Sequence, residues 1–269
     1  MSDFDNVIKM MNKQWNEVEI YFKNNSFDYN SYKDLTNLPF YDWMFQMLDE
    51  AIHTLVIDTG AIRTLYRAVK DINCKHDRFI PQKEYASDNR MNGKDKLYYY
   101  FGASYKTYKR EAIVTCLKEI RTKDEMVSVC KFDFIGDKNK IEIIDFTRDN
   151  SMPRSEDDLK KYIYKYISRD GKLGSYKAIA KVLINFLCNS VAFEPIDKEK
   201  TNEYELRYKY IPFWAITDYL ENMGYNGLLF SSTVDDRGKN LVLFKLDHAK
   251  YVEGTIESFN SNDYLKNRL

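Results

Sequence analysis

The chain has 269 residues, of which 44% are hydrophobic and 30% charged, values that are ordinary for a soluble globular protein with a core of its own. Its 41 basic and 41 acidic residues give a formal net charge of zero. This balance argues against a general binder of nucleic acids or anionic membranes, because such proteins carry a basic excess. The cysteines (Cys74, Cys116, Cys130 and Cys188) have no zinc-ligand spacing.

The amino-terminal segment MSDFDNVIKMMNKQWNE is polar and mixed in charge, so no signal peptide is expected, and no apolar run is long enough to span a membrane. We therefore expect a cytoplasmic protein with reduced thiols. His53, His76 and His248 occur singly, and GxSxG, HExxH and Walker motifs are absent. A metal mechanism or a hydrolase triad has no support.

Two amphipathic helices are predicted at the start of the chain, over 6–24 and over about 38–56, the second ending at DTG. The positions expected to face inward are Val7, Met10, Met11, Trp15, Val18 and Phe22 in the first helix, and Trp43, Met44, Met47, Leu48, Ile52 and Leu55 in the second. We interpret residues 1–60 as a helical extension that packs on a catalytic body. A surface for a partner protein is the alternative.

Strands are predicted from residue 63 onward. RTLYRAV (63–69) and YYYF (98–101) are typical of strands, and 71–96 is typical of a loop. Gly102 and Ala103 are expected to end the second strand. Ser104 is expected to cap a helix that runs to about residue 120.

The next two strand patterns, EMVSVCKFDFI and IEIIDF, are separated by GDKNK and are predicted to form a hairpin. Residues 147–200 read as a helical insertion, which includes a capping box of Ser155 and Asp158. Pro212 is expected in the first turn of a helix that ends at Gly224. GLLFSS and NLVLFKL are predicted as paired core strands. The fold class is thus α+β, with one mixed sheet wrapped by helices.

Several polar residues are candidates for an anion-binding cleft. Arg67 lies among apolar neighbours on a strand; spacing favours an outward side chain, whereas an inward one would need an anionic partner. Arg90 and Asn92 precede a glycine in a polar loop that is able to hold a diphosphate, although most loop arginines are merely solvated. Thr107 and Glu111 are spaced to share a helix face, and Glu111 is also a candidate for an ordinary surface salt bridge. The segment around Ser232 and Asn240 is equally compatible with turn chemistry.

In this order, the segments LYRAV, RMNG, YYFGASYKTYKRE, YNGLLFSS and NLVLF resemble the RES domain, a family named for its arginine, glutamate and serine. The resemblance covers roughly residues 63–246. The chain departs from the family pattern at Met91, at KTY in place of ETA, at Asn226 and at Trp214.

The resemblance implies a core like that of ADP-ribosyltransferases over 61–269 and an enzyme that cleaves the nicotinamide–ribose bond of NAD as its substrate, without a further cofactor. RES proteins are toxins that are silenced by an Xre-like antitoxin and arrest growth by depleting NAD. Glu111, Arg67 and Tyr100 match the catalytic positions. Arg90, Asn92, Thr107, Ser232 and Asn240 are expected to bind the substrate.

Two alternatives remain open in the sequence. One is an ADP-ribosyltransferase that modifies a macromolecule, and the other is a non-catalytic module that binds a nucleotide. In the enzymatic hypothesis, Glu111 stabilises the oxocarbenium-like centre at the ribose. The two arginines hold the pyrophosphate. The acceptor, whether water, inorganic phosphate or a protein side chain, is not specified by any motif.

Overall fold

The structure is a computed structural model that describes residues 3–25, 28–72, 74–93, 95–136, 140–147 and 202–266, and single positions between 157 and 178. Two compact units are present. The first contains residues 1–56, 89–93 and 146–222, and the second contains residues 57–88, 94–145 and 223–269. The helices predicted within 147–200, with the capping box of Ser155 and Asp158, fall where only those single positions are described.

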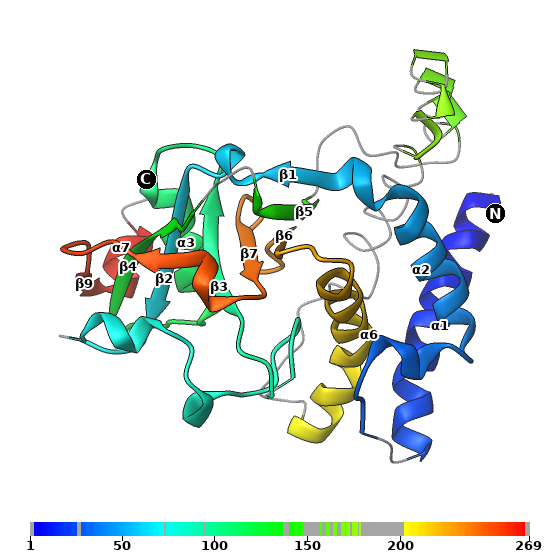
Figure 1. The fold of residues 1–269 in the computed structure, drawn as a ribbon. Coiled ribbons are helices and arrows are strands. Elements are labelled where there is room, and N and C mark those ends of the chain that lie inside the picture. The colour runs from blue at the N-terminus through cyan, green and yellow to red at the C-terminus, as the bar shows by residue number, and fades with distance from the viewer. Residues whose placement is uncertain are drawn as a thin grey trace. The chain divides into compact units, whose positions relative to one another are not determined.

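The first unit is helical (Figure 1). Its elements are α1 (Asp3–Asn25), the 3-10 turn η1 (Tyr32–Leu35), α2 (Pro39–Ala51), the 3-10 turn η2 (Ile52–Leu55) and α6 (Glu203–Asn222). Helix α1 packs against both α2 and α6. Both predicted amino-terminal helices are therefore confirmed, although the second ends in a 3-10 turn.

The core of this unit is rich in aromatic side chains. Trp15 of α1 makes edge-to-face contacts with Phe40 of α2 and Phe213 of α6, at centroid distances of 5.5 and 4.8 Å. Met11, Val18 and Phe22 are buried on the same face of α1, as predicted. Met10 was predicted to face inward, but it is 47% exposed. It lies one position before Met11, and neighbouring positions on a helix point about 100° apart.

Helix α6 begins nine residues before the position predicted for it. Pro212, expected in the first turn, lies inside the helix and is buried. The helix starts at Glu203, and the side chain of Asn202 accepts a hydrogen bond from the backbone N–H of Glu205. Because Asn202 caps the helix well before Pro212, the proline is an interior residue of α6. Its side chain is buried in the core of this unit rather than placed at the helix end.

The second unit contains most of a nine-stranded sheet. The strands are β1 (Val56–Asp58), β2 (Thr64–Val69), β3 (Tyr99–Ser104), β4 (Met126–Phe134), β5 (Glu142–Phe146), β6 (Gly227–Ser231), β7 (Lys239–Leu243), β8 (Ala249–Tyr251) and β9 (Glu257–Asn260). Their order is β1-β5-β6-β7-β3-β2-β4-β8, and β9 also pairs with β4. The helices of this unit are α3 (Lys109–Glu119) and α7 (Ser261–Lys266). The α+β class is confirmed.

The two faces of this sheet bury different clusters. One cluster includes Leu65, Tyr99, Phe101 and Leu241. The other joins Tyr66 and Ala68 of β2 to the buried residues of α3. Since side chains alternate along a strand, these clusters show which face each strand residue occupies.

Two local predictions are wrong. Strands β4 and β5 do not form a hairpin, because β4 pairs with β2, β8 and β9, whereas β5 lies between β1 and β6. Ser104 does not cap a helix, because β3 continues through Gly102 to Ser104 and α3 begins only at Lys109. The predicted pairing of the last two core strands is confirmed, since β6 and β7 are antiparallel neighbours.

Candidate functional site

Helix α3 lies very close to the sheet at Gly102. A Cβ atom at this glycine would stand 2.0 Å from the carbonyl oxygen of Ala112 and 2.7 Å from Sγ of Cys116. The Cys116 thiol accepts a hydrogen bond from the Gly102 N–H (3.1 Å) and donates one to the Tyr66 carbonyl (2.9 Å). Gly102 is therefore a site of close helix–strand packing, rather than the break in the strand that its sequence indicated.

Arg67 of β2 carries a charge with little compensation. Its Nε atom is buried and has no hydrogen-bond partner, and its Nη1 atom has only a long contact of 3.5 Å with the Tyr100 carbonyl. The guanidinium also lies 5.7 Å from the centre of the Tyr99 ring. Burial lowers the pKa of Arg67 from its ordinary value. Among the residues that the structure describes, no carboxylate forms an ion pair with it. The spacing favoured an Arg67 side chain that points outward to solvent, and this prediction is wrong, because its Nε atom is buried.

Glu111 lies in the first turn of α3 and is already engaged by two donors. Lys106 Nζ donates to its Oε1 at 3.0 Å, and Ser104 Oγ donates to its Oε2 at 2.8 Å. The hydrogen bond from Lys106 is the main reason why the pKa of Glu111 is lowered. Thr107 is exposed and precedes the helix, so the helix face that it was expected to share with Glu111 does not exist.

Arg67 and Glu111 are on opposite sides of the sheet. Arg67 stands between Tyr66 and Ala68, which both contact the α3 cluster, so its side chain alternates to the face of Leu65 and Tyr99. Glu111 comes from α3 on the other face. Tyr100 alternates to the α3 face as well, because Tyr99 and Phe101 occupy the opposite one.

Ser232 and Asn240 instead contact Glu119, at the carboxyl end of α3. Oε1 of Glu119 accepts hydrogen bonds from Ser232 Oγ (2.7 Å) and from Asn240 Nδ2 (2.5 Å). Asn240 is 6% exposed, whereas Glu119 is open to solvent. Within the described part of the chain, no hydrogen bond is recorded to Oε2 of Glu119.

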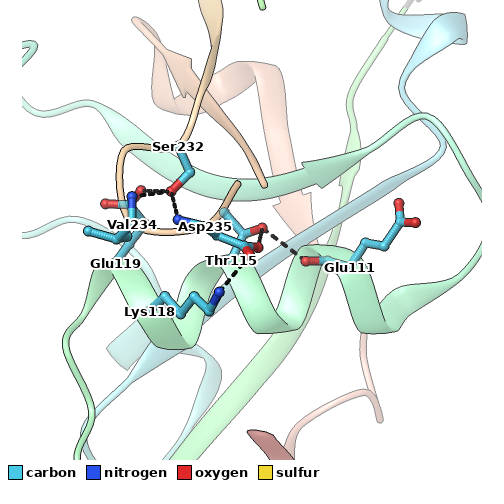
Figure 2. Close-up of polar contacts among 7 residues, drawn as sticks. All are labelled: Glu111, Thr115, Lys118, Glu119, Ser232, Val234 and Asp235. Carbon is cyan, nitrogen blue, oxygen red and sulfur yellow. Dashed lines mark hydrogen bonds and ion pairs between the residues drawn. The ribbon is translucent and has the colours of Figure 1, made fainter. Parts of the chain in front are cut away.

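The loop between β6 and β7 is locked onto α3 through Asp235 (Figure 2). This carboxylate is 4% exposed, forms an ion pair with Lys118 (2.7 Å) and accepts a hydrogen bond from Thr115 Oγ1 (3.1 Å). Ser232 Oγ in turn accepts hydrogen bonds from the backbone N–H groups of Val234 and Asp235. Figure 2 shows the Glu111 side chain pointing away from this group of contacts.

Arg90 and Asn92 belong to the first unit, where their loop is held on α6. The Arg90 guanidinium lies 5.6 Å from the centre of the Phe213 ring. Asn92 is buried, and its side chain donates to the Gly93 carbonyl. The loop is fixed by Trp214, which donates to the Asn89 carbonyl, and by Thr217, which donates to the Met91 carbonyl.

Glu119 and Asp235 were not singled out from the sequence, and Lys118 was considered only as a salt-bridge partner of Glu111, whereas it pairs with Asp235. Glu119 follows Glu111 by two steps of four residues along α3, so helical spacing was the available signal. Nothing in the local sequence distinguishes Asp235 from its neighbour Asp236. In the described ranges, no group of three or more His, Cys, Asp or Glu side chains is arranged to hold a metal ion. No described helix is sufficiently long and apolar to cross a membrane.

Comparisons with known proteins give one structural match. A chain of the crystal structure of the M. tuberculosis MbcT–MbcA toxin–antitoxin complex is 10% identical, with a TM-score of 0.38, over 84% of this chain and 97% of that one. No protein family and no curated protein matches the sequence. At this TM-score the match carries no functional argument.

Proposed function

We propose that the chain is an NAD-consuming enzyme that cleaves the bond between nicotinamide and ribose, as the RES-like order of its motifs implies. The observation that carries the proposal is the Arg67 guanidinium, whose buried Nε has no partner. Arg67 is partly buried, and a partly buried cation without an ion-pair partner is costly; an anionic ligand would supply the missing charge. A pyrophosphate provides oxygens of the right charge and geometry for a guanidinium.

Growth arrest by depletion of NAD, and silencing by an Xre-like antitoxin, belong to the same proposal and rest on the resemblance alone. The roles of Arg90, Asn92 and Thr107 in substrate binding have the same basis. Each of these three residues can be tested by substitution in the assay described next.

The direct test is to incubate the purified chain with NAD and to follow free nicotinamide, identifying the second product by mass. Hydrolysis gives ADP-ribose, and phosphorolysis gives its phosphorylated form. We expect the wild type to release nicotinamide and Arg67→Met to lose at least a hundredfold in kcat/KM, the order of effect of removing a charge-assisted contact. Arg237→Met, at an exposed arginine, is the matched control and should retain activity. A wild type that releases no nicotinamide contradicts the proposal.

A non-catalytic nucleotide-binding module is the second candidate, and one observation favours it. The carboxylate assigned to catalysis by the resemblance, Glu111, is engaged by Lys106 and Ser104 and lies on the face of the sheet opposite to Arg67. Calorimetry separates the two candidates. Tight NAD binding without nicotinamide release supports the binding module, and turnover excludes it.

The other alternative, an ADP-ribosyltransferase, differs in its acceptor. It requires transfer of ADP-ribose to a macromolecule, which NAD labelled in its ADP-ribose portion reveals. Label that stays with small molecules supports hydrolysis or phosphorolysis. Label that appears on protein or nucleic acid supports transfer.

A further inference from the structure

We propose that Glu119, rather than Glu111, is the carboxylate that faces the substrate, and that Ser232 and Asn240 are its positioning residues. This inference rests on the proposed cleavage of NAD. It changes the assignment that the order of motifs gave to Glu111, and it depends on contacts that the sequence does not reveal.

The hydrogen bonds of Glu119 are those of an oriented carboxylate. Both donors, Ser232 Oγ and Asn240 Nδ2, meet its Oε1 atom, at 2.7 and 2.5 Å. Within the described residues this leaves Oε2 with capacity to accept a further hydrogen bond, on a side chain that solvent can reach. A ribose hydroxyl is a donor of the required kind.

Glu111 differs from Glu119 in its electrostatic setting, because it is paired with a cation. Its two oxygens each have a protein donor, Lys106 on Oε1 and Ser104 on Oε2, and the ammonium group of Lys106 neutralises its charge. A carboxylate that must stabilise a developing positive charge is less effective when a cation is already paired with it.

The path of α3 along β3 brings Glu119, not Glu111, toward Tyr100. The helix runs back along the strand, since Ser104 contacts Glu111 and Gly102 contacts Cys116. Side chains on one face of a strand are two residues apart, so the residue of β3 that follows Ser104 and Gly102 on this face is Tyr100. The turn of α3 that follows Cys116 contains Glu119. The register agrees, because Asn240 pairs with Gly102 and is thus a diagonal neighbour of Tyr100 on the same face.

The setting of Glu119 is also rigid. Asp235 joins the β6–β7 loop to Thr115, about one turn before Glu119 on α3, and to Lys118, which directly precedes Glu119. The same loop holds Ser232, whose hydroxyl accepts two backbone N–H groups and donates to Glu119 (Figure 2). Groups fixed in this way before the substrate binds need little reorganisation during reaction.

In the reaction, the bond between ribose C1′ and the nicotinamide nitrogen breaks, and its electron pair leaves with nicotinamide, which departs neutral. Glu119 accepts a hydrogen bond from a ribose hydroxyl and stabilises the positive charge that develops on the ribose. Water, in the hydrolytic case, forms the new C1′–O bond and releases its proton to solvent. The carboxylate is unchanged at the end.

The test compares Glu119→Gln with Glu111→Gln, the same chemical change at two positions of one helix. Glutamine keeps an oxygen that accepts from Ser232 and Asn240, so a purely structural role for Glu119 predicts an active variant. We expect Glu119→Gln to lose about a hundredfold or more in kcat for nicotinamide release, with its NAD dissociation constant within about threefold of wild type. Glu111→Gln is expected to remain within about fivefold in kcat.

The outcomes separate the two claims. If the wild type releases no nicotinamide, the proposed function falls and this inference falls with it. If the wild type and Glu119→Gln release it equally, only the inference is overturned. A loss confined to Glu111→Gln, with NAD binding retained, also overturns the inference and restores Glu111.

Discussion

The Arg67 guanidinium and the Glu111 carboxylate lie on opposite faces of the sheet, although the order of motifs assigns both to one catalytic site. The clusters on either side of β2 establish this: Leu65 and Tyr99 pack on the face of Arg67, and α3 covers the face of Tyr66 and Ala68. The residues gathered around α3 are instead Glu119, Ser232 and Asn240. A site that uses Arg67 therefore includes neither Glu111 nor Glu119 automatically, because both glutamates belong to α3.

Arg67 is expected to lower the free energy of unfolding of the protein. Replacing it with methionine removes the charge whose Nε has no partner and keeps an unbranched, apolar side chain. We expect Arg67→Met to unfold at the same or a higher urea concentration than wild type, because apolar replacements of buried charges are often neutral or stabilising. Inorganic pyrophosphate should stabilise the wild type but not the variant. A variant destabilised by several kcal/mol would instead mean that Arg67 has a structural partner.

Gly102 offers a test of the contact between α3 and β3. Gly102→Ala places a methyl group where the Ala112 carbonyl oxygen and the Cys116 sulfur already lie, at 2.0 and 2.7 Å. Because the nearest atom is backbone, the helix itself must shift, and we expect a loss of about 3 kcal/mol or more in the free energy of unfolding. Gly254→Ala is the control, since its Cβ meets open space and only its positive φ of 71° is strained, at a cost of about 1 kcal/mol. Equal losses in the two variants would contradict the close packing.

Most helices and strands followed from the sequence, but their ends and partners did not. The apolar periodicity of α1 and the β-branched and aromatic runs of β2 and β4 are local signals, and these elements lie where they were predicted. The separation of β4 from β5 depends on strand pairing across the whole sheet, and the residues next to each strand in the sequence carry no information about that pairing. Pro212 lies inside α6 rather than in its first turn, because tertiary packing overrides a positional preference.

The candidate site shows the same division. The kinds of side chain in the candidate site were predicted from the sequence, which offered arginine, glutamate, serine and asparagine as candidates. The face on which Arg67 lies depends on which side of β2 is covered by α3, and that is a tertiary contact. Which of two glutamates on α3 meets Ser232 depends on where α3 begins. That start was placed at Ser104 because serine favours helix caps, yet here its hydroxyl bonds to Glu111 and to the Lys106 N–H.

Glu111 should make a small, pH-dependent contribution to stability. Its carboxyl pKa is lowered below the ordinary 4.5, chiefly by the hydrogen bond from Lys106. A carboxylate with a lowered pKa stabilises the fold above its ordinary pKa, and this contribution disappears as the pH falls through the pKa of the folded state. Because the side chain is 41% exposed, solvent screening limits the effect to about 0.5 kcal/mol.

Urea unfolding of wild type and Glu111→Gln checks this prediction. The wild type should be slightly more stable at pH 7, and the two proteins should converge as the pH falls through the lowered pKa of Glu111 in the folded state. Glu253→Gln, at an exposed glutamate, serves as the control. A difference that grows on acidification would have the opposite sign to that required by a lowered pKa.

The thiols should differ sharply in reactivity. Burial raises the pKa of Cys116 to about 12, so this thiol stays protonated at neutral pH, and Cys130 is buried with a raised pKa as well. Cys74 is partly exposed. We expect iodoacetamide to modify Cys74 in the folded protein and to spare Cys116 and Cys130, as measured by peptide mapping. Modification of Cys116 as fast as that of Cys74 would show that α3 opens readily.

Asp235 provides the last prediction, because its ion pair with Lys118 links a loop to a helix. Asp235→Asn removes the charge and leaves Lys118 without its partner, and the carboxylate is 4% exposed while the ammonium group remains 28% exposed. We expect a loss of about 2 kcal/mol in the free energy of unfolding, below the range for fully buried pairs because solvent reaches Lys118. When Lys118→Met and Asp235→Asn are combined, the loss in the free energy of unfolding should be smaller than the sum of the losses in the two single variants. If Asp235 also holds Ser232 against Glu119, nicotinamide release by Asp235→Asn should fall in kcat at temperatures where the variant is fully folded. Additive stability losses, together with unchanged kcat, would show that the loop is not locked through this pair.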